Sequence, residues 1–285
     1  MKTIAFSILN RNGLEDTITC VNSLLSLDFQ DFDIYLMDNG SNDTTEFQQL
    51  QKRYRDYNQI IINKSTTNLW FTGWNNYNLE LIKTQQYKYI CLLNNDCIVE
   101  QDFLWFLMRQ LQHINTDAIY WPVIKNPDGT IQSCGSMINL WLWTNPRLKN
   151  IIWPSQQVDC VSGSCFIISW SVFEEIWLLD DRYFAYREES DYCMRAKQAW
   201  YPVISLNIDG IIHKEETASN KKKPYYTYLM FRNRILFLRK HASRLQYIVS
   251  RGVLIVYMIF IFPRIFGLAN LKHACKGIVR GMFAQ

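Results

Sequence analysis

Acidic residues are missing from the end of the chain: none of the 26 Asp and Glu lies beyond residue 216. Residues 217–285 hold 13 of the 30 Lys and Arg, so residues 1–216 carry a net charge of −9. The overall charge of +4 is therefore the sum of an acidic body and a basic tail. Such an asymmetry indicates an anionic partner surface, either a membrane or a nucleic acid.

Glycine and proline are also scarce, with 11 Gly and 7 Pro among 285 residues. Together with 48% hydrophobic and 20% charged residues, this excludes a disordered or collagen-like chain. The chain is long enough to bury a substantial core, as one large α/β domain or two average ones.

Long hydrophobic runs are absent. The longest uncharged apolar stretch, residues 252–263, has 12 residues, against the ~20 that a membrane-spanning helix needs. The N-terminal run, residues 1–9, is too short for a signal peptide. Because Lys and Arg punctuate the tail, we expect an amphipathic helix in the membrane interface. The alternative is an ordinary helix packed on the body.

No pair of the eight cysteines has the CxxC spacing, and most of them stand in apolar runs. We therefore expect reduced core thiols in a cytosolic protein, with a zinc site or a disulfide framework as the alternative.

Strands and helices are predicted to alternate in the first 100 residues, which is typical of βαβ units and a mostly parallel sheet. The predicted strands cover residues 4–9, 33–37, 59–63 and 89–93, and the predicted helices 14–27, 44–57 and 74–83. Beyond residue 100 we expect helices at 102–114 and 188–200, strands at 119–124, 130–133, 158–169 and up to 206, and a hairpin turn at 126–129.

Polar clusters follow three of the predicted strands: Asn10-Arg11-Asn12, Asp38-Asn39 and Asn94-Asn95-Asp96. Ligands of parallel sheets bind beyond the carboxyl ends of the strands, so the pattern predicts a nucleotide site. Neither a GxGxxG nor a Walker loop occurs. Asp96 is placed to bridge Mg²⁺ or Mn²⁺ to a diphosphate. Its alternative role is a turn that caps the next helix.

Three carboxylates open the predicted helix at 188–200, where the helix dipole favours them. Asp191 and Arg195 share one face and can pair, whereas Glu189 lies about 100° around the axis. A carboxylate without a cation partner is the better proton acceptor, which favours Glu189. An acid-rich first turn of a surface helix is the alternative. His213, one of four histidines, ends an apolar strand-like run and taken alone is more often structural.

These ordered motifs resemble inverting glycosyltransferases of family 2, which have the GT-A fold, and within them a bacterial rhamnosyltransferase-like branch. The resemblance covers about residues 3–240. It also includes residues 68–76, 161–164 and 228–241, the last containing the triplet Arg232-Asn233-Arg234. It implies an α/β, Rossmann-like sheet, mixed but mostly parallel, flanked by helices, plus a basic helical C-terminal segment.

The resemblance also implies a role for each matching residue. Asp96 and His213 would bind Mn²⁺ or Mg²⁺, and Glu189 would be the catalytic base. The family's Glu-Asp is Glu188-Glu189 here, so Glu188 and Asp191 stay candidates, with Asp191 the runner-up. Nucleotide and donor contacts are expected from Asn10, Arg11, Asn12, Asp38, Asn39, Asn68, Gly73, Asn76, Asn94 and Asn95. Acceptor and donor loop contacts are expected from Gly163, Ser164, Arg195, Arg232 and Arg234.

The activity that this implies is a single displacement with inversion. The donor would be dTDP-rhamnose or a UDP-hexose. The acceptor would be a saccharide hydroxyl, carried by a polyprenyl diphosphate in O-antigen or capsule synthesis. Residues 1–216 would form the catalytic domain, with a nucleotide-sugar half (1–100) and an acceptor half (101–216). Residues 217–285 would dock on the anionic inner face of the cytoplasmic membrane, and the tail's Arg232, Arg234, Arg239 and Lys240 could contact the acceptor diphosphate.

Two other classes compete with this interpretation. A sugar nucleotidyltransferase also places Asp at strand ends, but usually begins with a Gly-rich basic loop that residues 10–12 do not form. A non-catalytic nucleotide- or nucleic-acid-binding protein could use the basic tail. The apolar run at 253–262 would then be an awkward exposed patch, so we expect no nucleic acid partner.

Overall fold

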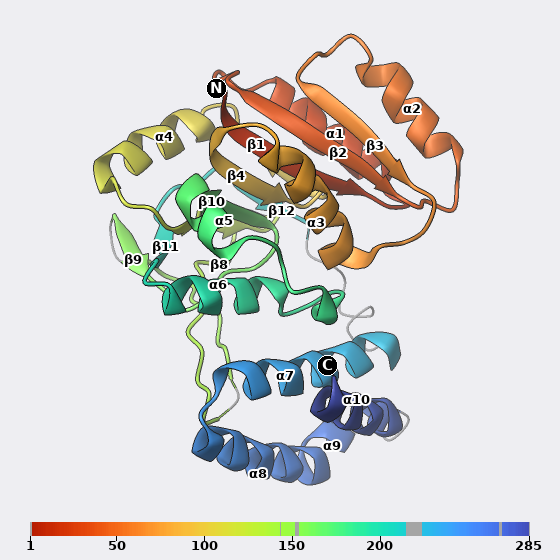
Figure 1. The fold of residues 1–285 in the computed structure, drawn as a ribbon, viewed down its shortest axis with the longest axis vertical. Helices are drawn as coiled ribbons and strands as arrows, with labels where there is room; N and C mark the ends of the chain where they lie inside the picture. The colour runs from red at the N-terminus through yellow and green to blue at the C-terminus, as the bar shows by residue number, and fades with distance from the viewer. Residues whose placement is uncertain (1, 143, 152–153, 215–223, 268–269, 285) are drawn as a thin grey trace.

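The computed structural model describes residues 2–142, 144–151, 154–214, 224–267 and 270–284. An α/β body stands on a layer of helices formed by the last part of the chain (Figure 1). The predicted boundary at residues 216/217 and Lys221–Lys223 lie outside the described residues. Among the helices described, none combines the length and hydropathy that a bilayer crossing requires.

The first half alternates strands and helices as predicted. β1 is the centre of a parallel set in the order β3-β2-β1-β4, because each crossover helix returns the chain to the same end of the sheet. α1 contacts α2 on one face, and α3 lies on the other (Figure 1). The elements are β1 (Lys2–Asn10), α1 (Leu14–Leu25), β2 (Phe32–Asn39), α2 (Thr45–Tyr54), β3 (Ile60–Ser65), α3 (Trp70–Lys83) and β4 (Tyr87–Leu93).

The second half extends this sheet to eight strands and confirms the predicted fold class. β10 (Cys165–Ser169) runs antiparallel to β4, and β6 (Ile119–Trp121), β11 (Val203–Leu206) and β9 (Ser155–Gln157) follow it. The predicted strand at 158–169 is wrong in its first half. There the chain leaves the sheet, and Ser136 exchanges backbone hydrogen bonds with Asp159 and Cys160 instead.

A four-stranded sheet brings His213 to the end of the parallel set. Its order is β5 (Cys97–Val99), β12 (Ile211–His213), β7 (Ile124–Lys125) and β8 (Ile131–Ser133). The predicted strand at 119–124 splits between the two sheets, with Pro122, which lacks an N–H donor, at the break. The predicted hairpin turn is confirmed by the bond from Asn126 N to Thr130 O (2.8 Å).

Four further helical segments cover the body: α4 (Phe103–Ile114), α5 (Trp170–Ile176), the 3₁₀ turn η1 (Asp181–Tyr183) and α6 (Glu188–Gln198). α5, which packs on β4 and β10, is absent from the prediction. All eight cysteines are free and seven are buried, which confirms the expected core thiols.

The C-terminal helices have a core of their own. They are α7 (Pro224–His241), α8 (Arg244–Phe260), α9 (Phe262–Phe266) and α10 (Leu271–Phe283). α10 presses on α7 so closely that a Cβ at Gly277 would lie 2.4 Å from Tyr228 O, and one at Gly281 2.4 Å from Arg232 O. Only glycine permits this approach of two backbones.

Candidate active site

Asp38, at the end of β2, offers one free acceptor at the carboxyl edge of the sheet. Its Oδ1 accepts hydrogen bonds from Ser41 N and Oγ (3.2 and 2.5 Å) and from Asn10 Nδ2 (3.4 Å). Asn10 is itself held by Glu46 and Thr17 (both 2.8 Å). The buried Asp38 Oδ2 has no partner among the described residues. Since a buried unpaired acceptor is costly, a ligand donor is expected there.

Other residues that were predicted to contact the sugar-nucleotide donor make hydrogen bonds within the protein. Asn39 donates to Asn68 Oδ1 (3.0 Å) and accepts from Leu69 N (2.7 Å), which fixes the start of α3. Asn76 makes two 2.9 Å bonds to the backbone of Leu179. Asn95 donates to Thr17 (2.8 Å). Arg11 and Asn12 are exposed at the edge, and Gly73 lies inside α3.

Asp96 and His213 meet because β12 pairs antiparallel with β5, so that His213 lies opposite Cys97. His213 Nε2 is 3.3 Å from Asp96 Oδ1. His213 Nδ1 donates to Gln132 Oε1 (2.8 Å). Since that amide oxygen can only accept, Nδ1 carries the proton and Nε2 presents its lone pair. Gln132 therefore positions the imidazole, a role that no sequence pattern indicated.

This pair suits a divalent cation. Asp96 Oδ1 is buried and has no hydrogen-bond partner in the described chain. The third group nearby, the Cys97 thiol, donates to Ser164 O (3.2 Å) instead. One carboxylate and one imidazole, the latter braced by an outer amide, are ligands that Mn²⁺ and Mg²⁺ accept.

The loop at 161–164 lies against the Asp96 turn. Ser164 O accepts a bond from Asn94 N (3.1 Å), and Asn94 Nδ2 is 3.4 Å from His213 Nε2. A Cβ at Gly163 would lie 3.0 Å from the Phe71 ring. Small residues here let the loop approach α3.

Glu188 and Glu189 open α6 as a carboxyl pair, with Glu188 buried and Glu189 half-buried. Burial raises the pKa of both, and the neighbouring Glu189 raises that of Glu188 further. The Arg187 charge opposes the rise at Glu189. Of the two carboxyl groups, Glu189 therefore loses its proton at the lower pH. Glu189 faces a cavity of about 250 Å³, which Ser133 of β8 also lines.

Asp191 is fully buried and is held by the side chains of two cations and one histidine. Arg195 Nε lies at 2.9 Å, which confirms the predicted pair, and Lys240 Nζ and His241 Nε2 both lie at 2.7 Å. Burial alone would raise the pKa of Asp191, but the bonds from His241 and Lys240 and the charge of Arg195 lower it. Arg195 also donates to the carbonyls of Ile176 and Leu178. Asp191 thus joins α6 to α7.

The segment before α6 has a strained backbone. Phe184, Tyr186 and Arg187 have φ of +61°, +69° and +81°, a conformation that non-glycine residues rarely adopt. Asn233 Nδ2 of α7 donates to the carbonyls of Tyr183, Ala185 and Tyr186 (2.8, 2.7 and 2.8 Å). α7 therefore holds the loop that delivers Glu189. Only the resemblance at residues 232–234 pointed to this segment.

The other basic residues predicted for the acceptor are engaged. Arg232 donates to Arg182 O (2.6 Å) and lies over the Phe184 ring. Arg239 donates to the carbonyls of Gly281 and Ala284. Lys240 also bonds Asp180 (2.7 Å).

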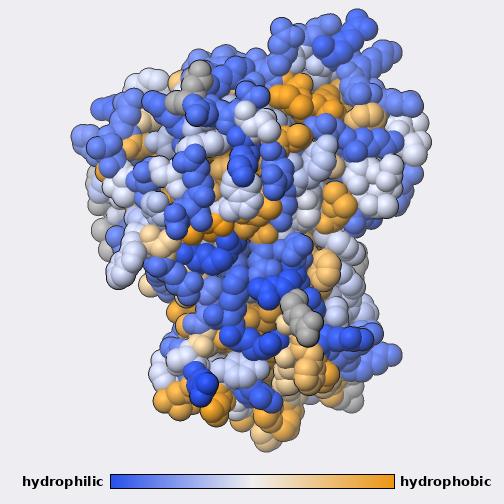
Figure 2. Space-filling view, viewed as in Figure 1, coloured by the Kyte–Doolittle hydropathy of each residue, from blue (hydrophilic) through white to orange (hydrophobic). Residues whose placement is uncertain are grey.

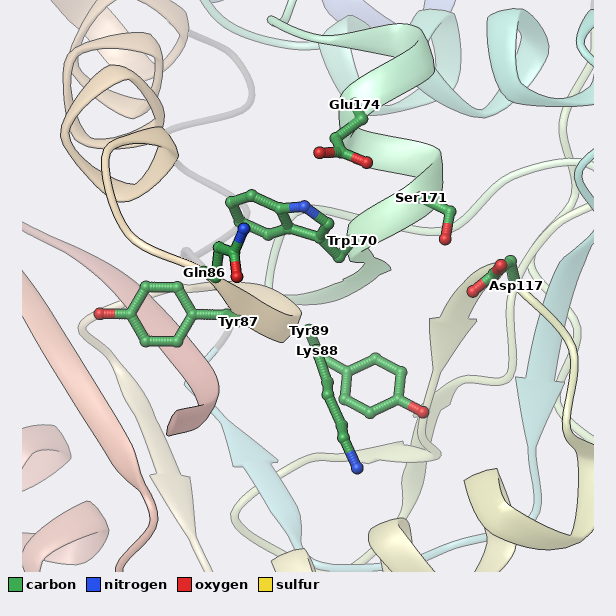
Figure 3. A pocket seen from close by; sticks show the side chains of 8 residues that line it. All are labelled: Gln86, Tyr87, Lys88, Tyr89, Asp117, Trp170, Ser171 and Glu174. Carbon is green, nitrogen blue, oxygen red and sulfur yellow. The ribbon is translucent and has the colours of Figure 1, made fainter. Parts of the chain in front are cut away.

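A separate hollow of about 480 Å³ lies at the other end of β4, where Tyr87 begins the strand and Trp170 begins α5 (Figure 3). Its two carboxylates, Asp117 and Glu174, come from different segments. None of the predicted site residues lines it.

The sequence profile of glycosyl transferase family 2 matches residues 4–177 of the chain. A curated relative, the low-salt glycan biosynthesis hexosyltransferase Agl10 of Haloferax volcanii, is 35% identical over 125 residues, 39% of this chain and 41% of that protein. The N-acetylglucosaminyl-diphospho-decaprenol L-rhamnosyltransferase of Mycobacterium tuberculosis is 30% identical over 111 residues, 33% of this chain and 36% of that protein. The chain thus matches about two fifths of these relatives' lengths.

Solved structures share the fold at low identity. S. aureus TarS residues 1–349 in complex with UDP-GlcNAc has a TM-score of 0.63 at 14% identity, covering 99% of this chain and 81% of that one. GalNAc-T7 with UDP, GalNAc and Mn²⁺ has a TM-score of 0.66 at 12% identity, covering 96% and 58%.

Replacing Asn233 by Ala removes the donor that three loop carbonyls share. We expect a loss of about 2–4 kcal/mol in unfolding free energy, since an uncompensated buried polar group costs ~1–3 kcal/mol. Hydrogen exchange at residues 183–188 should rise as well. Asn78→Ala is the matched control, because Asn78 donates to Ser7 and to Tyr35 O in the core, away from the loop. Unchanged hydrogen exchange at residues 183–188 in Asn233→Ala would contradict this role of Asn233.

Proposed function

Because the chain belongs to glycosyl transferase family 2, we propose that it transfers a sugar from a nucleoside-diphosphate sugar to a hydroxyl with inversion. One observation carries the proposal: β8 joins the Asp96–His213 pair to the cavity of Glu189. Gln132 of β8 holds His213, and the next residue, Ser133, lines the cavity. This contact supports the proposal that the diphosphate site and the proton acceptor belong to one site. This arrangement favours the transferase over the nucleotidyltransferase and the binding-protein alternatives.

Glu189 is the proposed base. It faces the cavity, whereas the carboxylate of Asp191 is enclosed by Arg195, Lys240 and His241 and accepts hydrogen bonds from them. Glu189 takes the proton of the acceptor hydroxyl as that oxygen bonds the anomeric carbon. The bond from that carbon to the diphosphate breaks, and inversion follows because attack and departure occur on opposite faces.

Asp96 and His213 would hold Mn²⁺ or Mg²⁺. The bound cation would stabilise the negative charge that develops on the leaving diphosphate. Asp38 Oδ2 offers an acceptor for an N–H of a nucleobase. Both dTDP-rhamnose and a UDP-hexose fit this chemistry, and the rhamnosyltransferase and hexosyltransferase relatives support these two sugar classes.

We further propose a lipid-linked saccharide acceptor, in synthesis of a bacterial surface polysaccharide, O-antigen or capsule. The relative named for a diphospho-decaprenol acceptor supports the lipid carrier. The docking surface on the inner membrane face would be the outer side of α8 and α9. Figure 2 shows hydrophobic side chains gathered at that end of the molecule. They are Leu245, Ile248, Val249, Ile255, Val256, Ile259, Phe260, Ile261 and Ile265, each 38–65% exposed.

Exposed basic side chains lie on α8, α9 and α10. They are Arg244, Arg251, Arg264, Lys272, Lys276 and Arg280. Each Lys or Arg near an anionic leaflet contributes about 1 kcal/mol. The combination is that of a helix lying in the membrane interface.

Glu189→Gln should lower the transfer rate by about 10²–10⁴-fold, the usual contribution of a general base. Binding of UDP or dTDP should stay unchanged, because Glu189 does not face the nucleotide edge. Stopped assays of product and calorimetric titration with nucleotide measure the two effects.

The pH profile discriminates between the candidate bases. A base acts deprotonated, so a raised pKa of Glu189 places the acid limb of kcat/KM above pH 4.5. With Asp191 as base the limb would lie below pH 3.8, because its pKa is lowered. Full activity of Glu189→Gln, together with an acid limb below pH 3.8, would reject Glu189 as the base.

EDTA should abolish transfer, and Mn²⁺ or Mg²⁺ should restore it. Gln132→Ala releases the imidazole of His213, so we expect about 10–100-fold more metal for half-maximal rescue. Thr130→Ala in the adjoining turn is the control. Equal metal requirements of the two variants, or activity that survives EDTA, would contradict the metal site.

The protein should float with vesicles that contain 30% anionic phospholipid. Replacing Ile248, Ile255 and Ile259 together by Ser should abolish flotation, because their side chains are 56–65% exposed. Trp105→Ser on α4, where the indole is 52% exposed, serves as the control. Flotation of the triple variant equal to that of the unmodified chain would exclude this surface.

A further inference from the structure

Trp70, the first residue of α3, has a backbone conformation that tryptophan rarely adopts. Its φ of +60° lies in the left-handed region, which glycine adopts freely and where a bulky side chain is an outlier. Two hydrogen bonds hold it there: Trp70 N donates to Asn68 Oδ1 (2.9 Å), and Asn39 Nδ2 donates to Trp70 O (3.5 Å). Since strained residues gather at functional sites, the indole is a candidate for a role in binding.

The indole of Trp70 is not buried in the core. It is 37% exposed, whereas Trp74, one turn later in α3, is 2% exposed. The Trp70 ring stacks on the ring of Tyr225 in the first turn of α7, with 5.2 Å between the ring centres and 23° between the planes. Tyr225 is 47% exposed and also contacts the ring of Tyr228 (6.3 Å). Trp70 and Tyr225 (the aromatic pair) therefore form an exposed apolar surface that α3 and α7 build together.

The aromatic pair adjoins the nucleotide side of the candidate site. Asn39, whose amide bonds the Trp70 carbonyl, directly follows Asp38, whose Oδ2 has no partner in the described chain. Phe71, the residue after Trp70, lies against Gly163, where an added Cβ would be 3.0 Å from the Phe71 ring. The loop of Gly163 in turn accepts a hydrogen bond from the turn that carries the proposed cation site.

The aromatic pair also adjoins the cavity of Glu189. Tyr226, the residue after Tyr225, lines that cavity. From the other helix, Thr72 N donates to Phe184 O (2.9 Å), which belongs to the loop that leads to Glu189. The pair therefore lies between the nucleotide side of the site and the proposed base.

A sugar ring is the group that suits this surface. The C–H bonds on one face of a pyranose are apolar and pack on an aromatic face, while the indole N–H and the phenol O–H at the rim can bond sugar hydroxyls. In a sugar transfer, the group that lies between the diphosphate and the acceptor hydroxyl is the sugar itself.

We propose that Trp70 and Tyr225 bind the sugar ring of the nucleotide-sugar donor. The inference rests on the proposed function, in which Asp96 and His213 hold a cation at the diphosphate and Glu189 meets the acceptor. Because one ring comes from α3 and the other from α7, the sugar subsite is complete only when both helices are in place.

Calorimetric titrations in the presence of Mn²⁺ test the aromatic pair without requiring turnover. UDP-glucose and dTDP-rhamnose are each compared with UDP and dTDP. Trp70→Gly removes the ring at a backbone conformation that glycine adopts without strain, so α3 should keep its start. Binding of the nucleotide sugar should weaken by about 10-fold, the scale of one aromatic contact. UDP and dTDP should bind unchanged, because they lack the sugar.

Three further variants sharpen this comparison. Tyr225→Ala removes the other ring and should cause a similar loss, which keeps the test valid if Trp70→Gly does not fold. Trp70→Phe retains a ring and should keep most of the affinity. Trp200→Gly is the matched control, because Trp200 has a φ of +69° and is 92% exposed but lies past the far end of α6, about 18 Å from Glu188. Circular dichroism confirms that each variant is folded.

Four outcomes would overturn the proposal. An equal loss of nucleotide and nucleotide-sugar affinity in Trp70→Gly would assign the ring to the nucleotide or to the fold. Unchanged nucleotide-sugar affinity in both Trp70→Gly and Tyr225→Ala would exclude a contact with the donor sugar. A raised KM for the acceptor alone would assign the pair to the acceptor, and an equal loss in Trp200→Gly would show an unspecific effect. Failure of the unmodified chain to bind or hydrolyse any nucleotide sugar would instead count against the proposed function.

Discussion

The grip of Asn233 on the strained loop at residues 183–187 is the constraint on which the site depends. Three of those loop residues have positive φ, and the carboxyl pair follows at once. The strained backbone persists because the side-chain amide of Asn233 donates to three carbonyls of this loop. Arg232 donates to a fourth carbonyl, that of Arg182, just before the loop. α7 therefore fixes the loop that carries the proposed base. The membrane-docking role proposed for the tail is left to α8 and α9.

The pKa values of two acidic residues of α6, Glu189 and Asp191, are shifted in opposite directions by their surroundings. Contacts with Arg195, Lys240 and His241 lower the pKa of Asp191, which connects α6 to α7. Glu189, two residues earlier, keeps a raised pKa in a cavity. Separation of pKa values by environment is how a protein assigns structural and proton-transfer roles to like groups. The pKa of a third carboxyl, Glu188, is raised by burial and by the charge of Glu189.

The sequence predicted most of what local pattern controls. Alternating strands and helices gave the parallel set, and helical spacing gave the Asp191–Arg195 pair. Val158, Cys160 and Val161 resembled a strand because they are buried, but their segment forms only an isolated bridge with Ser136 and no strand of the sheet. The meeting of Asp96 with His213 depends on pairing between strands far apart in the chain, which spacing alone does not reveal. Arg187 and Arg147 reach one cavity from irregular loops, where no periodicity exists to read.

The two glycines of α10 connect the end of the described chain to the candidate site, about 90 residues earlier in the sequence. Gly277 and Gly281 pack against the carbonyls of Tyr228 and Arg232 in α7. α10 therefore supports the helix that carries Asn233. During synthesis, the ribosome must add about 90 further residues after Glu189 before that support exists. A growing chain thus has its sheet, with Asp96 and His213, before the loop that carries the proposed base is fixed. That loop is fixed only when the helices with the proposed docking surface have been made.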